Sequence, residues 1–313
     1  MNRYADRILR EYPVRRRPEE KEKFRLWLMG TLRELGYQPE LQSRQSALQF
    51  GGNVLNVVAG DPKRAKLILV AHYDTAIRSL LPPLYMPTRP LTAFLYLALT
   101  PALVLIGSFV LSFALTFPIN APYLTLPLFL LLLVTALLYL RFGPSERRNL
   151  NDNTSGVVAL LETAAALTPR YRGEVAFAFL DGGFGGLSGA KGFRARYPSA
   201  KEKTVINLCS VAEGSELLVL PNKNSRWDGA LLDAILDSFE NGEHTTVFLK
   251  TDGLTYFPSD NRAFRYACSI CACETVRGFG RLVRPLKATE IDEEKTQILK
   301  NGLCKLIERY QIA

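Results

Sequence analysis

Two segments of the chain place metal-binding types of side chain beside apolar runs. Residues 67–71 read Leu-Ile-Leu-Val-Ala, which is typical of a buried strand, and His72 and Asp74 follow it. Asp152 lies just before a second apolar stretch, residues 155–167, whose spacing predicts a helix. Imidazole nitrogen and carboxylate oxygen are ligands that zinc accepts in hydrolases. The two segments therefore predict a pocket that holds a histidine and carboxylates at the end of a strand.

A third segment ends in a turn rich in glycine. Residues 174–180 form another apolar strand, and the sequence Asp-Gly-Gly-Phe follows at positions 181–184, with two more glycines after it. Glycines after a strand are typical of phosphate-binding loops, but this turn lacks the Gly-Lys-Ser/Thr ending, and its spacing is not Gly-x-Gly-x-x-Gly. No nucleotide site is expected here.

The order of these three segments resembles the zinc-dependent aminopeptidase and glutamate carboxypeptidase family, which is family twenty-eight of metallopeptidase clan MH. The resemblance rests on His-Tyr-Asp-Thr at 72–75, Asp-Asn-Thr-Ser-Gly at 152–156 and the turn at 181–184, and it extends from about residue 26 to the last helix. It implies an α/β fold of the zinc-exopeptidase type, a mixed and mostly parallel sheet with helices on both faces. Strands that alternate with helices along the chain favour the same class.

The resemblance also implies roles for the matching residues. His72 takes the place of the histidine that binds the first zinc, and Asp152 that of the aspartate bridging both metals. Asp74 corresponds to the carboxylate that orients the histidine ring. His72 and Asp152 are thus retained ligand positions. Read without the resemblance, His72 is a strand-end histidine bonded to backbone and Asp152 an ordinary helix-cap residue.

Four other positions of the resembled site carry residues that do not suit two zinc ions. Gly183 stands at the place of the general base and Phe184 at that of a zinc-binding glutamate. Cys209 and Asn261 replace an aspartate and a late histidine that bind the second zinc. Because a general base alone contributes ~10²–10⁴ in rate, four such changes together predict a catalytically inactive, peptidase-like pseudoenzyme. No catalytic residue and no cofactor are then expected, unless a residual site binds zinc.

Cys209 allows two interpretations. A thiolate is an accepted zinc ligand, so Cys209 could complete a residual site with His72 and Asp152. The plain alternative is a small apolar side chain buried in the core. The chain has five cysteines, with no pattern of a disulfide framework, which suits a reducing compartment.

A long apolar insert separates the first segment from the second. Residues 90–140 contain no charged side chain, and a membrane-spanning helix needs about 20 apolar residues. We expect two spans, residues 93–116 and 123–140, joined by a turn that contains two prolines; a pair of buried helices in a large soluble core is the alternative. The expected organisation is a first part of the α/β domain at 1–90, a transmembrane hairpin at 91–141 and the rest of the domain at 142–313.

Arginines flank the insert and predict its orientation. Arg78 and Arg89 precede the first span and Arg141, Arg147 and Arg148 follow the second, while the connecting turn has no charge. Because basic residues stay on the cytoplasmic side, both termini and the α/β domain should be cytoplasmic, in a membrane protein with two spans. The insert follows the strand of the first segment, so the pocket mouth should face the bilayer.

The net charge of +9 favours an anionic membrane surface as a partner. No zinc finger, basic zipper or RNA-binding signature is present, so nucleic acid is not expected.

Three functions remain open from the sequence. The first is a membrane-anchored binding or scaffolding module without catalysis, with a peptide or protein as partner. The second is an active metal-dependent aminopeptidase or amidohydrolase with a remodelled one-metal site, in which Asp181 or Glu213 serves as the base. The third is a membrane assembly factor in which the hairpin is the working part. The ligand and the oligomeric state stay open.

Overall fold

The computed structural model describes residues 2–44, 53–184, 186–288 and 290–310. Within these residues nine strands form one mixed sheet in the order β1-β2-β4-β3-β5-β8-β6-β7, and β9 pairs with β8. The central strands β4, β3, β5 and β8 run parallel to one another. β2 runs antiparallel to both β1 and β4, and β6 runs antiparallel to β8. The strands are β1 Glu40–Arg44, β2 Val54–Ala59, β3 Leu67–His72, β4 Val175–Leu180, β5 Thr204–Leu208, β6 Glu216–Pro221, β7 Thr246–Leu249, β8 Tyr266–Val276 and β9 Gly280–Leu282.

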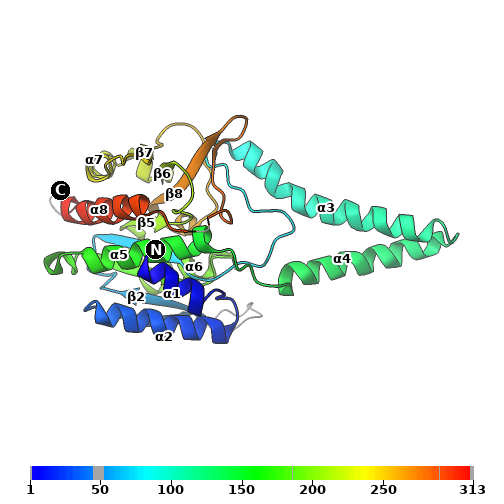
Figure 1. The fold of residues 1–313 in the computed structure, drawn as a ribbon, viewed down its shortest axis with the longest axis horizontal. Coiled ribbons are helices and arrows are strands. Elements are labelled where there is room, and N and C mark those ends of the chain that lie inside the picture. The colour runs from blue at the N-terminus through cyan, green and yellow to red at the C-terminus, as the bar shows by residue number, and fades with distance from the viewer. Residues whose placement is uncertain (1, 45–52, 185, 289, 311–313) are drawn as a thin grey trace.

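Helices cover both faces of the sheet, as the fold class predicts (Figure 1). One face packs against α1, α2, α5, α7 and α8, and the other packs against α6. Successive residues of β3 point to opposite faces of the sheet. Leu69 packs on the face that α5 covers and Val70 on the face that α6 covers, so both sides of the strand are apolar. These helices are α1 Arg3–Glu11, α2 Pro18–Glu34, α5 Ser155–Ala166, α6 Ser188–Arg196, α7 Gly229–Ser238 and α8 Glu293–Arg309.

The central helix α5 lies unusually close to the sheet because of one glycine. A Cβ atom added to Gly156 would lie 2.5 Å from the carbonyl oxygen of Leu208 and 3.2 Å from the Cβ of Ala71. Only a residue without a side chain allows the first turn of α5 to touch the ends of β3 and β5 in this way. Gly156 therefore brings Asp152, which precedes α5, next to His72 at the end of β3.

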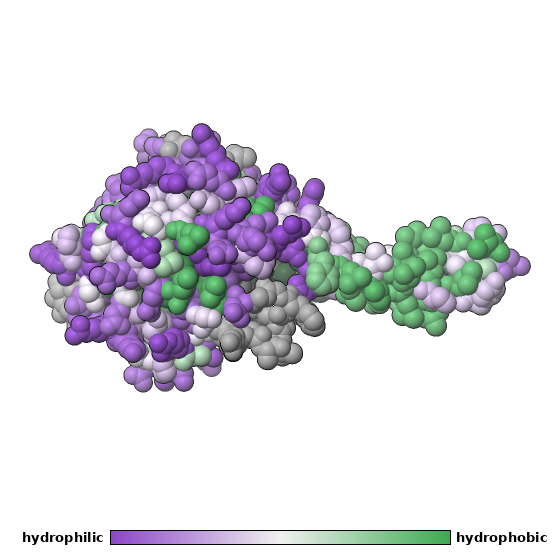
Figure 2. Space-filling view, turned by 90° about the horizontal axis from the view of Figure 1, so that it is seen from below, coloured by the Kyte–Doolittle hydropathy of each residue, from purple (hydrophilic) through white to green (hydrophobic). Residues whose placement is uncertain are grey.

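Two long apolar helices, α3 Pro90–Thr116 and α4 Thr125–Phe142, project from the domain as one arm (Figure 1). Both are long and apolar enough to cross a membrane, and the expected first span lies inside α3. The second span begins in the short helix Pro122–Leu124 and continues through α4. Figure 2 shows apolar side chains over much of the arm, while the surface of the domain is mainly hydrophilic.

A narrow seam holds the two helices of the arm together. Its residues on α3 recur at every fourth position, so that they share one face of the helix. Thr116 Oγ1 lies 2.6 Å from Thr125 Oγ1 on the facing helix, and Phe109 packs edge-to-face against Phe129. The buried seam residues of α3 are Val104, Ser108, Ser112 and Thr116.

The roots of the arm are fixed to the domain. Ile77 and Ser145 form an antiparallel bridge between the segments that precede α3 and follow α4. Tyr85 exchanges two backbone hydrogen bonds with Val283, beyond the last strand, at 2.9 and 3.1 Å. The guanidinium of Arg16 donates to the carbonyl oxygens of Arg141 and Gly143, at the end of α4. The segments at both roots of the arm are therefore bound to each other and to the α/β domain at several points.

Candidate metal centre

His72, Asp152 and Cys209 lie together at one edge of the sheet. One ligand atom from each, a ring nitrogen, a carboxylate oxygen and the thiol sulfur, lie within 4.8 Å of one another. His72 ends β3, Cys209 follows the parallel neighbour β5, and Asp152 belongs to the π-helical turn Leu150–Thr154 before α5. Ligand sites of α/β sheets collect at the carboxyl ends of parallel strands, and this cluster lies at such an edge. All three residues are buried.

The backbone holds this cluster firmly. The amide of Ser210 donates to the carbonyl of Asp152 at 3.1 Å, and the amide of Cys209 donates to Ile270 on β8 at 3.2 Å. Ser210 has a positive φ of 57°, which a non-glycine residue adopts rarely, so the chain leaves β5 in a sharp turn. This turn brings Asp152 and Cys209 together.

His72 has a close acidic neighbour, Asp260. The Nδ1 atom of His72 lies 3.4 Å from Oδ2 of Asp260, an ion-pair distance without the alignment of a hydrogen bond. Among the described residues, neither ring nitrogen of His72 and neither carboxylate oxygen of Asp260 has a hydrogen-bond partner. Burial by itself would lower the pKa of His72, but the carboxylates of Asp260, Asp152 and Asp74 outweigh it and raise this pKa to about 9.

Burial also shifts the other two members of the cluster. It raises the pKa of Asp152 to about 6, with a further contribution from Asp74 and against the opposing charges of His72 and Arg15. Burial, followed by the negative charge of Asp152, raises the pKa of the Cys209 thiol well above its usual range. The three donors thus have shifted pKa values because they are buried close to one another.

Asp74 contacts the turn after β4. Its carboxylate accepts hydrogen bonds from the amides of Gly183 at 2.8 Å and Phe184 at 3.4 Å. Among the described residues these are the hydrogen bonds of the Asp74 carboxylate, and the expected bond to the His72 ring is not formed. Asp74 therefore positions the segment that carries Gly183 and Phe184.

That turn leaves no space for a larger residue at Gly183. A Cβ atom built there would lie 2.9 Å from Cδ2 and Cγ of His72, closer than real Cβ atoms approach a neighbour. Phe184 packs its ring edge-to-face against His72 with 5.3 Å between the ring centroids, and it remains 45% exposed. The turn thus presents a backbone and an apolar ring to His72.

Asp181 and Glu213, the alternative bases, are both paired with lysines. Asp181 Oδ1 lies 2.5 Å from the Nζ of Lys21, and Glu213 lies 2.6 Å from the Nζ of Lys287. Neither belongs to the cluster of His72, Asp152 and Cys209. Asn261, the fourth replaced position, is buried and accepts a hydrogen bond from Ser259 Oγ at 3.1 Å.

Arg15 is a site residue that the sequence reasoning missed. Its side chain is completely buried beneath the cluster, and burial lowers its pKa to about 9, so the guanidinium stays charged at neutral pH. It donates to five acceptors, Tyr12 O, Tyr73 O, Asn149 Oδ1, Asn153 Oδ1 and Thr154 Oγ1, at 2.6–3.2 Å. Asp260 was not predicted either, although it directly precedes Asn261, which stands at the position of the late histidine.

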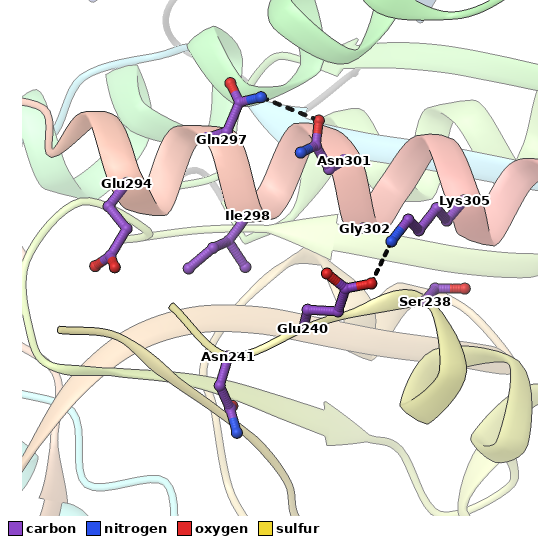
Figure 3. A pocket seen from close by; sticks show the side chains of 9 residues that line it. All are labelled: Ser238, Glu240, Asn241, Glu294, Gln297, Ile298, Asn301, Gly302 and Lys305. Carbon is purple, nitrogen blue, oxygen red and sulfur yellow. Dashed lines mark hydrogen bonds and ion pairs between the residues drawn. The ribbon is translucent and has the colours of Figure 1, made fainter. Parts of the chain in front are cut away.

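A separate groove lies between α8 and the segment after α7 (Figure 3). Its volume is about 210 Å³, and the ion pair between Glu240 and Lys305 bounds it. It shares no residue with the cluster around His72.

Comparison with known proteins agrees with the predicted fold. Residues 141–275 match the sequence model of peptidase family M28, whereas no curated protein sequence matches the chain. The glutaminyl cyclase of Porphyromonas gingivalis superposes with a TM-score of 0.61 at 13% identity, covering 98% of this chain and 96% of that one. A Zn-dependent exopeptidase of Parabacteroides distasonis gives 0.59 at 14% identity, with 97% and 94% covered. The chain therefore has an M28-like fold.

The residues present do not fit a two-zinc centre but do fit a single cation. Gly183 and Phe184 offer no ligand atom, and Asn261 already binds Ser259. His72, Asp152 and Cys209 offer nitrogen, oxygen and sulfur donors within reach of one another, all of which zinc accepts. The unpartnered ring nitrogens of His72 agree with this fit, because buried polar atoms rarely lack a partner.

Proposed function

We propose that this chain is a membrane-anchored protein whose M28-like domain binds a peptide or protein segment at the membrane surface without hydrolysing it. The observation that carries the proposal is the geometry of the turn after β4. Gly183 approaches His72 so closely that a side chain there would collide with the ring, and Phe184 covers the ring from another side. A hydrolase of this fold needs a carboxylate to accept a proton at this place, and the turn provides none.

The pairing of the remaining acids supports the same proposal. A general base must reach the reacting group and be free to take its proton. Asp181 also accepts hydrogen bonds from the amides of Gly182 and Leu55, in addition to its ion pair with Lys21. These three partners stabilise the carboxylate as a structural group that fastens α2 to the turn.

The membrane anchor is the arm formed by α3 and α4. Its two helices meet the length and apolarity of membrane spans, and most of their large apolar side chains are exposed. Arginines on both roots and none in the connecting turn support a cytoplasmic α/β domain with both termini on the same side. The hairpin 91–141 is then an insert between two parts of one domain, 1–90 and 142–313.

A second candidate is an active amidohydrolase with one metal ion. The cluster of His72, Asp152 and Cys209 favours it, because three protein ligands are the number that catalytic zinc sites use. Beside this cluster, and among the described residues, Asp260 is the carboxylate whose two oxygens lack a hydrogen-bond partner, and it faces the imidazole of His72. Asp260 is therefore the group on which this candidate depends.

A hydrolysis assay distinguishes the two candidates. The full chain in detergent micelles or nanodiscs, supplied with Zn²⁺ or Co²⁺, is tested on aminoacyl anilides and on peptides with an N-terminal glutamine. We expect no turnover above that of His72→Ala, because no base is in place. Turnover that the wild type shows and both His72→Ala and Asp260→Asn lose would establish the second candidate instead.

The topology is tested with single added cysteines in intact cells. Asn120→Cys, in the turn of the hairpin, should react from outside with a membrane-impermeant maleimide. Glu243→Cys, on the exposed surface of the α/β domain, should react after lysis only. Labelling of Glu243→Cys in intact cells, or release of the protein by an alkaline wash, would contradict the proposed anchor.

A further inference from the structure

We infer that His72, Asp152 and Cys209 form a mononuclear metal site that takes one zinc-like divalent cation with a thiolate among its ligands. The inference rests on the proposed function, since it concerns the same site. It assigns Cys209 the role of a metal ligand. The resemblance in sequence implies two zinc ions at this place. The proposed site holds one ion instead, bound by a nitrogen, an oxygen and a sulfur donor of this chain.

The spacing of the three donors suits one ion. Zinc bonds of ~2.0–2.3 Å in a tetrahedron place neighbouring ligand atoms roughly 3.3–3.8 Å apart. The three atoms already lie within 4.8 Å of one another. Movements of about 1 Å, which small side-chain rotations supply, would therefore close the site around a cation without any change in the strands.

Unpartnered atoms provide a second, independent observation. Both ring nitrogens of His72 are buried and have no hydrogen-bond partner among the described residues. Leaving a buried polar group unpaired costs ~1–3 kcal/mol, so natural structures usually avoid it. If a cation binds one ring nitrogen of His72 and Asp260 faces Nδ1, both ring nitrogens have a partner. Asp260 is then a positioning residue for the ring.

Charge and ligand softness select the kind of metal. A carboxylate from Asp152 and a thiolate from Cys209, both buried, together neutralise one divalent ion. Sulfur and imidazole ligands favour zinc, whereas magnesium and calcium prefer oxygen ligands alone. Apolar packing is the alternative role of Cys209. Cys271 serves as a control for this role, because it is buried in the same small apolar cluster as Cys209 and Phe257.

Cobalt spectroscopy tests this site directly and does not depend on activity. The purified full chain is stripped with a chelator and titrated with Co²⁺, followed by competition with Zn²⁺ and Mg²⁺. We expect one Co²⁺ per chain with a thiolate-to-cobalt charge-transfer band in the near ultraviolet, displaced by Zn²⁺ but not by Mg²⁺. Failure of the wild type to bind close to one equivalent, or binding without this band, would overturn the inference.

Matched variants assign the sulfur ligand. Cys209→Ser should abolish the band and weaken zinc binding beyond the ~10–100-fold that is typical of outer-sphere changes. Cys271→Ser should leave both unchanged, and circular dichroism shows whether each variant is folded. A band that Cys271→Ser loses, or that Cys209→Ser keeps, would refute the ligand set. The hydrolysis assay is read separately, so an inactive protein with this spectrum supports both proposals, and an active one overturns the binding proposal alone.

Discussion

Arg15→Met tests how much of the stability of the cavity depends on one buried guanidinium. Methionine keeps most of the aliphatic stem of Arg15 and removes its charge and all its donors. The side chain is completely buried, and four of its five acceptors belong to the segments that carry His72 and Asp152, while Tyr12 O lies at the end of α1. The substitution therefore removes the hydrogen bonds that Arg15 makes to both segments without opening a large cavity, while the bonds from Asn153 Nδ2 to Tyr73 O and Asp74 O remain.

The size of the effect follows from the acceptors that lose a donor. Tyr73 O can still accept from Asn153 Nδ2 at 3.3 Å, and Asn149 Oδ1 from Thr154 Oγ1 at 2.9 Å. The remaining acceptors lose a charged donor, at ~1–3 kcal/mol for each buried group left unpaired. The lower part of the range for the summed loss of free energy agrees with the ~3–5 kcal/mol that removing one member of a buried charged network costs.

Thermal unfolding of the full chain in detergent measures this loss. With an unfolding entropy of about 2.1 cal/mol/K per residue, each kcal/mol corresponds to about 1.5–2 °C for a chain of this length, so Arg15→Met should melt roughly 5–10 °C below the wild type. Arg17→Ala, an exposed neighbour, should stay within about 1 °C of the wild type. A melting temperature of Arg15→Met at or above the wild-type value would show that the desolvation of the guanidinium cancels its hydrogen bonds, and would refute this account.

Three further predictions concern the site and the last helix. Asp260→Asn should weaken zinc binding ~10–100-fold in calorimetry by removing the charge beside His72; unchanged affinity would deny Asp260 a positioning role. Gly183→Glu should displace His72 and lower zinc affinity without producing hydrolysis, and turnover in this variant would contradict the steric argument. Asp292→Ala removes the N-cap of α8 and should cost ~1 kcal/mol in urea unfolding at neutral pH. Partial burial would raise the pKa of Asp292, but Lys295 and two backbone amides lower it below 3.8, so its contribution is present above pH 3.8 and disappears as the pH falls through its lowered pKa.

The sequence predicts the fold well where a segment is strongly apolar. The strand expected at 67–71 is Leu67–His72, the helix expected at 155–167 is Ser155–Ala166, and the strand expected at 174–180 is Val175–Leu180. The short amino-terminal helix Arg3–Glu11 was not predicted, because charged residues dominate it and three inward-facing residues alone make its apolar face. Edge strands such as Glu40–Arg44 were missed because polar side chains interrupt their pattern.

The site was predictable in its membership but not in its contacts. Spacing and resemblance predicted that His72, Asp152 and Cys209 belong to one cavity, and their donor atoms do lie together. Contacts of Asp260 and Arg15 could not be predicted, because they come from segments distant in the sequence. In the sequence Arg15 only adds to the net positive charge, and a charged side chain that folds inward gives no pattern of its own.

The attachment of the arm limits the ligands that the cavity can meet. Arg16 holds the end of α4 through Gly143 and Arg141, and the preceding residue, Arg15, holds the segments of His72 and Asp152. Because these two arginines are consecutive, α4 cannot swing away from the domain without breaking bonds beneath the cavity. If the arm lies in a bilayer, the cavity keeps a fixed distance and direction relative to that bilayer. A ligand that remains at the membrane surface meets such a cavity repeatedly, whereas a dilute soluble peptide does not, and this difference favours a membrane-associated partner on our proposal.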